Sequence, residues 1–345
     1  MKMRYLGRTG LQVSAIGFGT ATFGGNDEYY RAHGTLAGDE ARRMIDVCRG
    51  AGVNLFDTSN VYSAGLAEQI LGEALGSARD DVLISTKLRY PVGEGHNDAG
   101  LSRHHIIEAC EASLRRLGTD RIDLLQLHEY DAATPWEETL RALDDLVRAG
   151  KVRYLGVSNF SAWMIMKMLT VSERRGWERV ISHQASYSLI ERNIEYDHVP
   201  MAESEGVGHI VWGPLAGGLL TGKYHRGEPG PEGARRTQIG DLAPIDEERA
   251  YDIVDVLREI AEVHNVTPSQ VAINWLLVQP TVSSVLVGAR REEQLADNLA
   301  SVTWELEPAE IERLTTVSAV RVPYPAWHQR NHANDRPVGV GRAVP

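Results

Sequence analysis

The chain has 345 residues, enough for two domains or for one large α/β barrel, a fold that uses about 250 residues or more as a single domain. Its composition, with 43% hydrophobic and 24% charged residues, is ordinary for a soluble globular protein. The formal net charge of −11 argues against general binding to nucleic acid or to an anionic membrane, because both need clustered positive charge.

No segment of the sequence marks the chain for export or for a membrane. The first residues, M-K-M-R-Y-L-G-R, lack the apolar core of a signal peptide, and no stretch approaches the ~20 apolar residues of a membrane span. Cys48 and Cys110 are the only cysteines, and neither belongs to a C-x-x-C motif, so we interpret both as core residues. We therefore expect a cytoplasmic protein.

Short apolar runs of strand length alternate along the chain with longer amphipathic segments. The runs predict eight strands, which end at Thr20, Asp57, Lys87, His128, Asn159, Gln184, Trp212 and Gly288. Apolar residues at helical spacing predict helices at residues 41–49, 67–75, 104–117, 136–147, 162–174, 198–204, 249–263 and 292–300. Apolar strands that alternate with helices form parallel sheets buried on both faces. Eight such units predict an α/β fold, a closed (β/α)8 TIM barrel.

Three segments fall outside this repeat. Residues 3–12 turn at T-G and suit a short hairpin that closes the bottom of the barrel. Residues 215–245 form a long loop rich in Gly, Pro and Arg after the seventh strand, and long loops in compact domains are usually functional. The tail at residues 321–345 is predicted to be irregular. Because no linker interrupts the pattern, we predict a single domain over residues 1–345.

A doubly wound sheet is the competing architecture. Its phosphate-binding turn, G-x-G-x-x-G between the first strand and the first helix, is not met, because Thr22 stands where the third glycine belongs. The barrel is therefore the preferred fold. Barrel enzymes place their active sites at the carboxyl ends of the strands, so the polar residues at the predicted strand ends should meet at one mouth.

The motifs at the strand ends carry a resemblance to a known family. They are G-F-G-T, N-L-F-D-T-S-N-V-Y, L-I-S-T-K, L-L-Q-L-H, L-G-V-S-N-F and G-A-R-R-E-E-Q-L-A-D-N-L, in register over nearly the whole chain. With these motifs the chain resembles an aldo-keto reductase, from a branch similar to bacterial relatives of the potassium-channel β-subunits. The resemblance implies a catalytic tetrad, which consists of Asp57, Tyr62, Lys87 and His128.

The chemistry of carbonyl reduction explains why the site needs these four residue types. The reaction adds hydride to carbon and a proton to oxygen, so the site needs an acid within reach of the oxygen. A phenol with a pKa near ~10 holds its proton tightly, and a neighbouring ammonium lowers that pKa. We expect Tyr62 to be the acid and Lys87 to lower its pKa. Asp57 would hold Lys87, and His128 would orient or polarise the carbonyl.

The same resemblance implies a nicotinamide dinucleotide cofactor and no metal. At the nicotinamide end it implies contacts with Thr20, Asp57, Ser158, Asn159, Gln184 and Trp212. Three of these would hold the carboxamide, namely Ser158, Asn159 and Gln184, and the tryptophan would stack on the ring. The loop W-G-P-L-A-G-G-L-L-T-G-K would wrap the pyrophosphate with Gly213, Pro214, Leu215 and Lys223. The eighth unit would hold the adenosine 2′-phosphate and adenine with Gly288, Arg290, Gln294 and Asn298.

One position of this eighth unit departs from the pattern of many family members. Gln294 stands where some of them have a second basic residue, so Arg290, with Arg291 adjacent, is the charged contact for the 2′-phosphate. The branch that the chain resembles still favours NADPH. We therefore predict NADPH (NADP+) as the cofactor, with NADH as the weaker alternative.

The predicted partner is a small carbonyl compound. In the resembling family, loops after the first, fourth and seventh strands and the carboxyl-terminal tail shape the pocket. Phe23, Tyr130 and Trp327 are the candidate wall residues, with ordinary loop packing as an equally good explanation. The segment R-Y-P-V-G-E-G-H-N-D-A-G after Lys87 could add a lid. Aldehydes, ketones, ketosugars and quinones all remain open.

Two other functions stay in view. The first is a regulatory subunit like the channel-associated branch, which binds cofactor with little turnover; His128 argues against it, because that branch characteristically has asparagine there. The second is a metal-dependent barrel hydrolase, suggested by twelve histidines. Such sites often include an H-x-H strand, which the first strand lacks, and alternation points His183 away from the mouth if Gln184 faces it.

Overall fold

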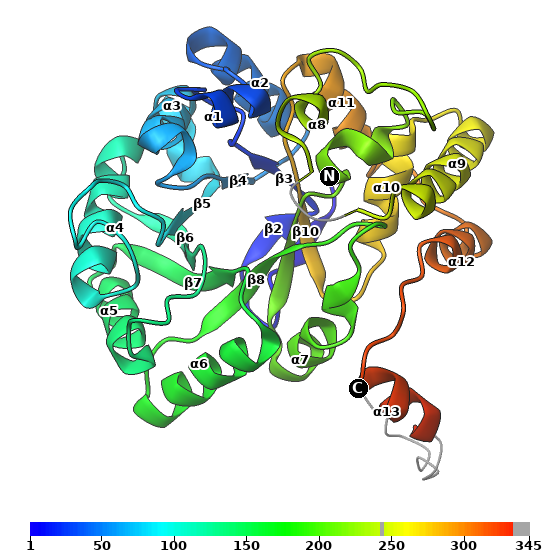
Figure 1. Cartoon of the computed structure of the whole chain (residues 1–345). Helices are drawn as coiled ribbons and strands as arrows, with labels where there is room; N and C mark the ends of the chain where they lie inside the picture. The colour runs from blue at the N-terminus through cyan, green and yellow to red at the C-terminus, as the bar shows by residue number, and fades with distance from the viewer. Residues whose placement is uncertain (242–244, 334–345) are drawn as a thin grey trace.

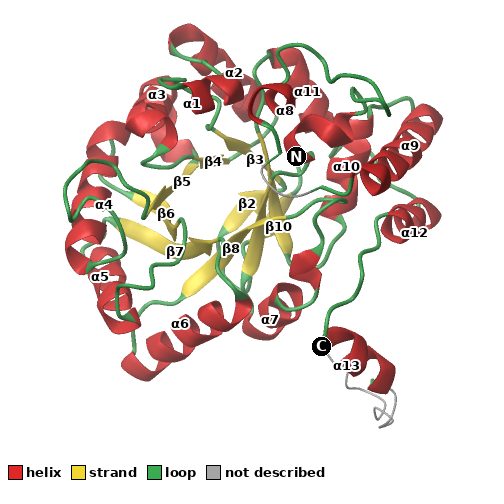
Figure 2. Ribbon diagram, viewed as in Figure 1, coloured by secondary structure: helices red, strands yellow, loops and turns green. Residues whose placement is uncertain are grey.

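Eight parallel strands close into a barrel at the centre of the protein, and helices surround it (Figure 1 and Figure 2). The computed structural model describes residues 1–241 and 245–333. Around the barrel the strands follow the order β10-β3-β4-β5-β6-β7-β8-β9. Their bounds are β3 Ile16–Gly19, β4 Leu55–Asp57, β5 Leu83–Leu88, β6 Ile122–Leu127, β7 Val152–Ser158, β8 Val180–Ser186, β9 Gly208–Trp212 and β10 Val282–Val287. The predicted (β/α)8 barrel is confirmed.

A two-stranded antiparallel hairpin precedes the barrel, as the sequence predicts. It consists of β1 Met3–Tyr5 and β2 Gln12–Ser14. Leu6 and Val13 are fully buried, and they form one apolar cluster with side chains of the barrel strands, namely Leu55, Leu124, Ile181, Ile210 and Leu286. The Arg8 amide donates to the Gly206 carbonyl, at 2.8 Å, just before β9 begins. The hairpin therefore closes the amino-terminal end of the barrel and leaves the other end to the site.

The helices form a ring outside the strands, and all eight predicted helices are present. They are α2 Gly38–Gly50, α3 Leu66–Leu75, α4 Arg103–Leu117, α5 Trp136–Arg148, α6 Ala162–Arg175, α7 His198–Glu205, α9 Glu247–His264 and α11 Glu292–Ala300. Their apolar faces build the main core against the strands. In the part of the chain that the structure describes, no helix is both long and apolar enough to cross a membrane.

The structure adds a helix, α10 Pro268–Leu277, that the periodicity does not predict. Every residue from Ser269 to Leu277 is buried, so this helix shows no polar face along its length. Helix α10 packs against β10, whereas α9 packs on α10 and on α12 Pro308–Val317. The helix that covers the last strand is therefore α10, and α9 lies outside it.

Short helices replace parts of the expected loops and tail. They are α1 Glu28–His33, α8 Arg235–Ile239 and α13 Ala326–His332. The prediction of an irregular tail is corrected by α13, which lies beyond the helix ring in Figure 1. Its short length and its lack of any buried residue explain why no apolar period announces it. Residues 334–345 of the predicted tail, and 242–244 of the long loop, lie outside the described residues.

Candidate active site

The register of the strands brings the predicted tetrad to one end of the barrel. Asp57 ends β4 and pairs with Ser85, two residues before Lys87 on β5. His128 follows β6 directly, and its amide donates to the Leu88 carbonyl at 2.9 Å. Tyr62 lies on the turn η1 Tyr62–Gly65 that follows β4. The carboxyl ends of three neighbouring strands therefore supply all four residues.

Lys87 and Asp57 form a buried ion pair at the centre of the tetrad. Their exposed fractions are 0% and 2%, and the Lys87 ammonium contacts the Asp57 carboxylate directly. The ammonium also donates to the Thr58 carbonyl at 2.8 Å and lies 3.3 Å from the Tyr62 hydroxyl. Burial alone would lower the pKa of Lys87, but Asp57 and Tyr62 outweigh burial and raise that pKa. Lys87 therefore carries its positive charge at neutral pH.

The second oxygen of Asp57 is held by a set of side chains inside the barrel. Ser85 Oγ and Gln184 Nε2 each donate to Asp57 Oδ2 at 2.8 Å. Gln126 Nε2 donates to Ser85 Oγ at 2.8 Å and lies 3.4 Å from the same carboxylate oxygen. A buried carboxylate needs such donors, because an unpaired buried charge costs several kcal/mol. These contacts fix Asp57, and through Asp57 they fix the Lys87 ammonium.

Burial dominates the acidity of Tyr62. Burial of the phenol raises its pKa, and the opposing charge of Lys87, whose ammonium lies 4.9 Å from the ring centroid, offsets only part of that rise. Lys87 therefore lowers the pKa of Tyr62 as expected, but desolvation has the larger effect, and the pKa lies above its ordinary value. Tyr62 keeps its proton at neutral pH, and the same proton is held beside a permanent positive charge.

His128 is neutral under ordinary conditions. Burial first, and then the charges of Lys87 and Arg89, lower the pKa of this imidazole to about 2. Its Nδ1 lies 3.1 Å from Ser59 Oγ, and its ring centroid lies 5.9 Å from that of Tyr62. Among the described residues Nε2 has no hydrogen-bond partner. A neutral ring with a free nitrogen beside the phenol can hydrogen-bond to a carbonyl oxygen.

The three residues predicted to hold a carboxamide lie together at the mouth, and the side-chain amides of two of them, Asn159 and Gln184, already form hydrogen bonds within the protein. Asn159 Nδ2 donates to the His128 carbonyl at 3.0 Å, and Trp212 Nε1 donates to Asn159 Oδ1 at 3.2 Å. Gln184 Nε2 is bound to Asp57, so its Oε1 is the amide atom left over. Ser158 pairs with Gln184 in the register of β7 and β8. Trp212, Asn159 and His128 are thus linked across the ends of three strands.

The loop after β9 forms a backbone cradle. Its turn η4 spans Ala216–Thr221, and Gly213, Gly217 and Gly218 adopt φ values of 69°, 69° and 95°. A Cβ atom at Gly217 would lie 3.0 Å from Nη2 of Arg235, and one at Gly218 would lie 3.0 Å from Nζ of Lys223. Glycine is therefore required at these positions for two reasons: the backbone has a positive φ, and two cationic side chains approach it closely.

Four cations gather near this cradle. Lys223, Arg235, Arg290 and Arg291 are close enough that burial, and then the three arginines, lower the pKa of Lys223. Within residues 1–241 and 245–333 none of the four forms an ion pair with a carboxylate, whereas the neighbouring Arg236 binds Asp241 and Glu247. Uncompensated cations around glycine-rich backbone fit the phosphates of a dinucleotide.

Further contacts join the eighth unit to this cluster. The Arg290 amide donates to Gln294 Oε1 at 3.3 Å, and Arg290 Nη1 donates to the Gly233 carbonyl at 3.2 Å. Next to the eighth unit, Thr20 follows β3, the strand that pairs with β10, and its Oγ1 is buried and has no partner among the described atoms. An orphaned buried hydroxyl beside Asp57 is consistent with a contact to a bound molecule.

Two of the three predicted wall residues do not border the tetrad. Phe23 is 0% exposed and packs on Phe18 with ring centroids 5.8 Å apart, so it belongs to the core. Trp327 is 46% exposed on α13, where its ring contacts are Tyr324 and His328. Both predictions are corrected: the loop after β3 folds inward, and the tail helix lies outside the ring. Tyr130 remains at the mouth, partly buried and stacked on Trp136 at 5.1 Å.

The structure places three further side chains beside the tetrad. The ring centroid of Tyr30 lies 6.1 Å from that of Tyr62, and the ring centroid of Tyr90 lies 4.7 Å from that of His128. Arg89 lies close enough for its charge to affect the His128 pKa. Tyr90 and Arg89 occur in the segment named above as a possible lid, and Tyr30 on α1 carries no such signal. Tyr30 and Tyr90 therefore form aromatic walls directly beside the tetrad.

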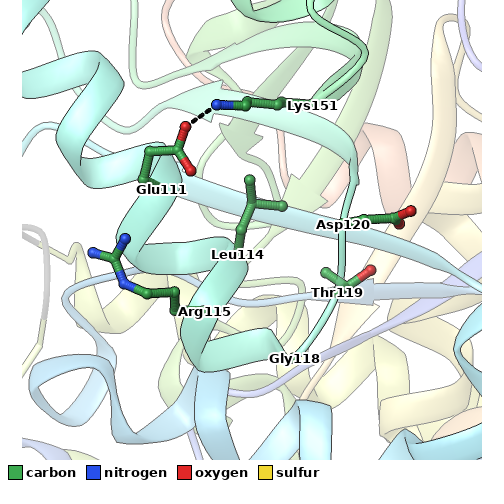
Figure 3. A pocket seen from close by; sticks show the side chains of 7 residues that line it. All are labelled: Glu111, Leu114, Arg115, Gly118, Thr119, Asp120 and Lys151. Atoms are coloured by element: carbon green, nitrogen blue, oxygen red, sulfur yellow. Dashed lines mark hydrogen bonds and ion pairs between the residues drawn. The ribbon is translucent and has the colours of Figure 1, made fainter.

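The surface hollow of Figure 3 lies far from this mouth. Its lining residues are Glu111, Leu114, Arg115, Gly118, Thr119, Asp120 and Lys151. It surrounds the turn between α4 and β6, at the amino-terminal ends of the strands, and the Lys151–Glu111 ion pair crosses it. Nor does the described part of the chain gather three or more His, Cys, Asp or Glu side chains in a metal-binding arrangement.

Comparisons with known proteins cover almost the whole chain. The sequence model of the Aldo/keto reductase family matches residues 15–319. The uncharacterized oxidoreductase YrpG of Bacillus subtilis (strain 168) is 36% identical over 318 residues, which are 89% of this chain and 93% of that protein. A probable voltage-gated potassium channel subunit beta of Arabidopsis thaliana is 38% identical over 311 residues, 88% and 91% of the two chains. A putative subunit of the same kind from Schizosaccharomyces pombe (strain 972 / ATCC 24843) is 36% identical over 309 residues, 87% of each chain.

Proposed function

The chain belongs to the aldo/keto reductase family, whose members are oxidoreductases, and from this premise we propose that it is an NADPH-dependent reductase of aldehydes or ketones with Tyr62 as the general acid. The observation that carries the proposal is the linked tetrad, in which one buried ammonium contacts both the Asp57 carboxylate and the Tyr62 hydroxyl. The substrate is a small carbonyl compound, with sugar-derived carbonyls included. We also propose that the protein works in the cytoplasm as a single domain, without nucleic acid or membrane.

In this proposal the chain's residues hold the substrate oxygen and supply its proton. Bound NADPH supplies a hydride to the carbonyl carbon. Tyr62 donates its proton to the carbonyl oxygen, and the Lys87 ammonium stabilises the phenolate that remains. His128, neutral and with a free Nε2, hydrogen-bonds to the same oxygen and fixes its position. Asp57 keeps the ammonium in place through the contacts described above.

The cationic cluster supports NADPH, which carries a 2′-phosphate, over NADH. Arg290→Ala should weaken NADPH binding about 10- to 100-fold, because a charge-assisted hydrogen bond to phosphate contributes about 1.5 to 3 kcal/mol. NADH binding should change far less, since NADH lacks the 2′-phosphate. Titration of nicotinamide fluorescence measures both affinities. Arg313→Ala, on α12 and paired with Glu259, is the matched control. Equal losses for NADPH and NADH would show that Arg290 does not contact the 2′-phosphate.

The rate of reduction should not change with pH through the titration of a histidine. Because the pKa of His128 is about 2, this ring stays neutral across the working range. Tyr62 must be protonated to donate, and burial raises its pKa above the ordinary ~10 of tyrosine, so the rate should fall only as pH rises past that range. A kcat/KM profile for an aldehyde between about pH 5.5 and 9 should therefore be flat. An inflection between about pH 6 and 7 that disappears in His128→Asn would contradict this assignment.

A panel of carbonyl compounds tests the proposed function itself. Purified protein is mixed with NADPH and with aldehydes, ketones, ketosugars and quinones, and the decrease in NADPH absorbance is followed with and without a chelator. We expect at least one compound to be reduced at the same rate in both conditions. Activity that a chelator abolishes and zinc restores would overturn the metal-free mechanism.

The relatives favour one second candidate. Two of them are named as channel β-subunits, so a regulatory subunit that binds NADPH with little turnover is the alternative for this chain. Tight NADPH binding together with no turnover anywhere in the carbonyl panel would support it. The intact tetrad, with His128 in place, supports the reductase instead.

A further inference from the structure

Arg89 places a positive charge at the mouth, away from the cationic cluster near the cradle. It follows β5, and in the order of strands β5 lies four places from β9 in either direction. Arg89 and the Lys223 loop therefore approach the mouth from opposite sides. The guanidinium carbon lies 5.3 Å from the centroid of the Tyr90 ring, and that ring lies 4.7 Å from His128. The charge is thus beside the substrate end of the tetrad.

The backbone holds Arg89 in a conformation that glycine prefers. Its φ is 142°, a region in which a residue with a side chain costs of order 1–3 kcal/mol. The Gly100 amide donates to the Arg89 carbonyl at 2.8 Å, and Arg89 Nε donates to the Tyr130 carbonyl at 3.2 Å. Strain of this kind is concentrated at functional sites, where the surrounding structure imposes it.

The charge of Arg89 has no carboxylate partner among the described residues. Asp131 is the nearby acid whose pKa its charge helps to lower, but that carboxylate accepts hydrogen bonds from the Ala133 and Leu101 amides and from Thr134. Glu129 Oε1 accepts from the Tyr130 amide. Within the described ranges Arg89 donates only through Nε, so both Nη groups are left without a protein acceptor. A half-buried guanidinium in this state is a ready partner for an anion.

We propose that Arg89 binds an anionic group of the substrate, and that the enzyme prefers carbonyl compounds that carry a carboxylate or a phosphate. The inference rests on the proposed reductase function and adds the substrate class. The planar guanidinium matches both kinds of anion with two parallel N–H donors. Arg89 is then a specificity residue, whereas the proton still comes from Tyr62.

Two matched substrate pairs test this inference. The first compares 4-formylbenzoate with its neutral methyl ester, and the second compares glyceraldehyde 3-phosphate with glyceraldehyde. For each pair the ratio of kcat/KM, anionic over neutral, is measured. In the wild type we expect a ratio of about 10 to 100 for at least one pair, the scale of one charge-assisted contact. The pair that shows it identifies carboxylate or phosphate.

Variants at the same position separate charge from folding. Arg89→Met should bring the ratio of kcat/KM, anionic over neutral, close to one, and Arg89→Lys should keep part of the preference. Arg103 lies on the outer ring and is paired with Asp145, so the control variant Arg103→Met should keep the full wild-type ratio. Arg89→Gly should also lose the ratio while it keeps the thermal stability of the wild type, because glycine adopts a φ of 142° without strain.

Two outcomes would overturn the inference. One is a ratio near one for both pairs in a wild type that reduces the neutral aldehydes, and the other is a large ratio that survives in Arg89→Met. If the wild type reduces none of the four aldehydes, and none of the wider carbonyl panel, the proposed reductase function is wrong. The proposed role of Arg89 is then wrong as well, because it depends on that function.

Discussion

Tyr62→Phe should lower kcat at least about 100-fold and leave NADPH affinity nearly unchanged. The substitution removes the hydroxyl that lies 3.3 Å from the Lys87 ammonium, and it keeps the ring that packs near Tyr30 and His128. The cationic cluster proposed to bind the cofactor phosphates is not touched. Loss of rate without loss of binding is the signature of a missing proton donor.

Two measurements decide the result for Tyr62. Fluorescence titration gives the NADPH affinity, and steady-state kinetics on the best substrate of the carbonyl panel give kcat. Tyr30→Phe is the matched control, since it removes a phenol from the same mouth that the mechanism does not use. Near-wild-type turnover in Tyr62→Phe would mean that the proton comes from another group.

Lys87→Met should damage both rate and stability. The ammonium is fully buried and neutralises Asp57, so its removal leaves a buried carboxylate without a counter-charge, at a cost of about 3 to 5 kcal/mol in the free energy of unfolding. It also removes the charge that offsets burial at Tyr62, so the phenol becomes a weaker acid. We expect kcat to fall roughly 100-fold or more, on the scale of one acid catalyst.

The double variant Asp57→Asn/Lys87→Met separates these two effects. It removes both charges together, so the free energy of unfolding in urea should recover most of what Lys87→Met alone loses. Activity should not recover, because the ammonium is still missing beside Tyr62. A double variant that regains turnover along with stability would show that the Lys87 charge matters only for folding.

The barrel was predictable because each unit repeats the same physical pattern. Apolar runs too short for helices ended in Asp57, Lys87 and His128, and parallel strands in a barrel must present those ends together. The family resemblance added Tyr62, which lies on a turn and has no periodic signal of its own. That family assignment is confirmed by the match over residues 15–319.

The missed helix and the misplaced aromatic residues share one cause. A helix is recognised from its hydrophobic periodicity only when it has one buried face and one exposed face. Helix α10 has no exposed face, because it is buried on all sides. Conversely, the sequence does not show whether the side chain of an aromatic residue in a loop faces the core, the mouth or the outside of the barrel. Phe23 turned inward to Phe18, whereas Trp327 formed part of a helix beyond the ring.

Electrostatics at the mouth depended on distances that the sequence does not contain. Arg235 and Arg236 are adjacent on α8, yet Arg236 is paired with acids and Arg235 lies against Gly217. The positive φ of Arg89 likewise has no sequence signal. The pKa of Tyr62 required the balance between burial and one ammonium, and the structure puts burial ahead.

The central claim is that this tetrad catalyses turnover rather than only holding a cofactor. The most direct measurement is a reaction with excess NADPH and the best carbonyl of the panel, in which alcohol formed and NADPH consumed are quantified together for the wild type and for Tyr62→Phe. We predict one alcohol per NADPH over many turnovers in the wild type, and a Tyr62→Phe protein that binds NADPH but forms at least about 100-fold less alcohol in the same time. A wild type that binds NADPH tightly and forms no alcohol would contradict the account.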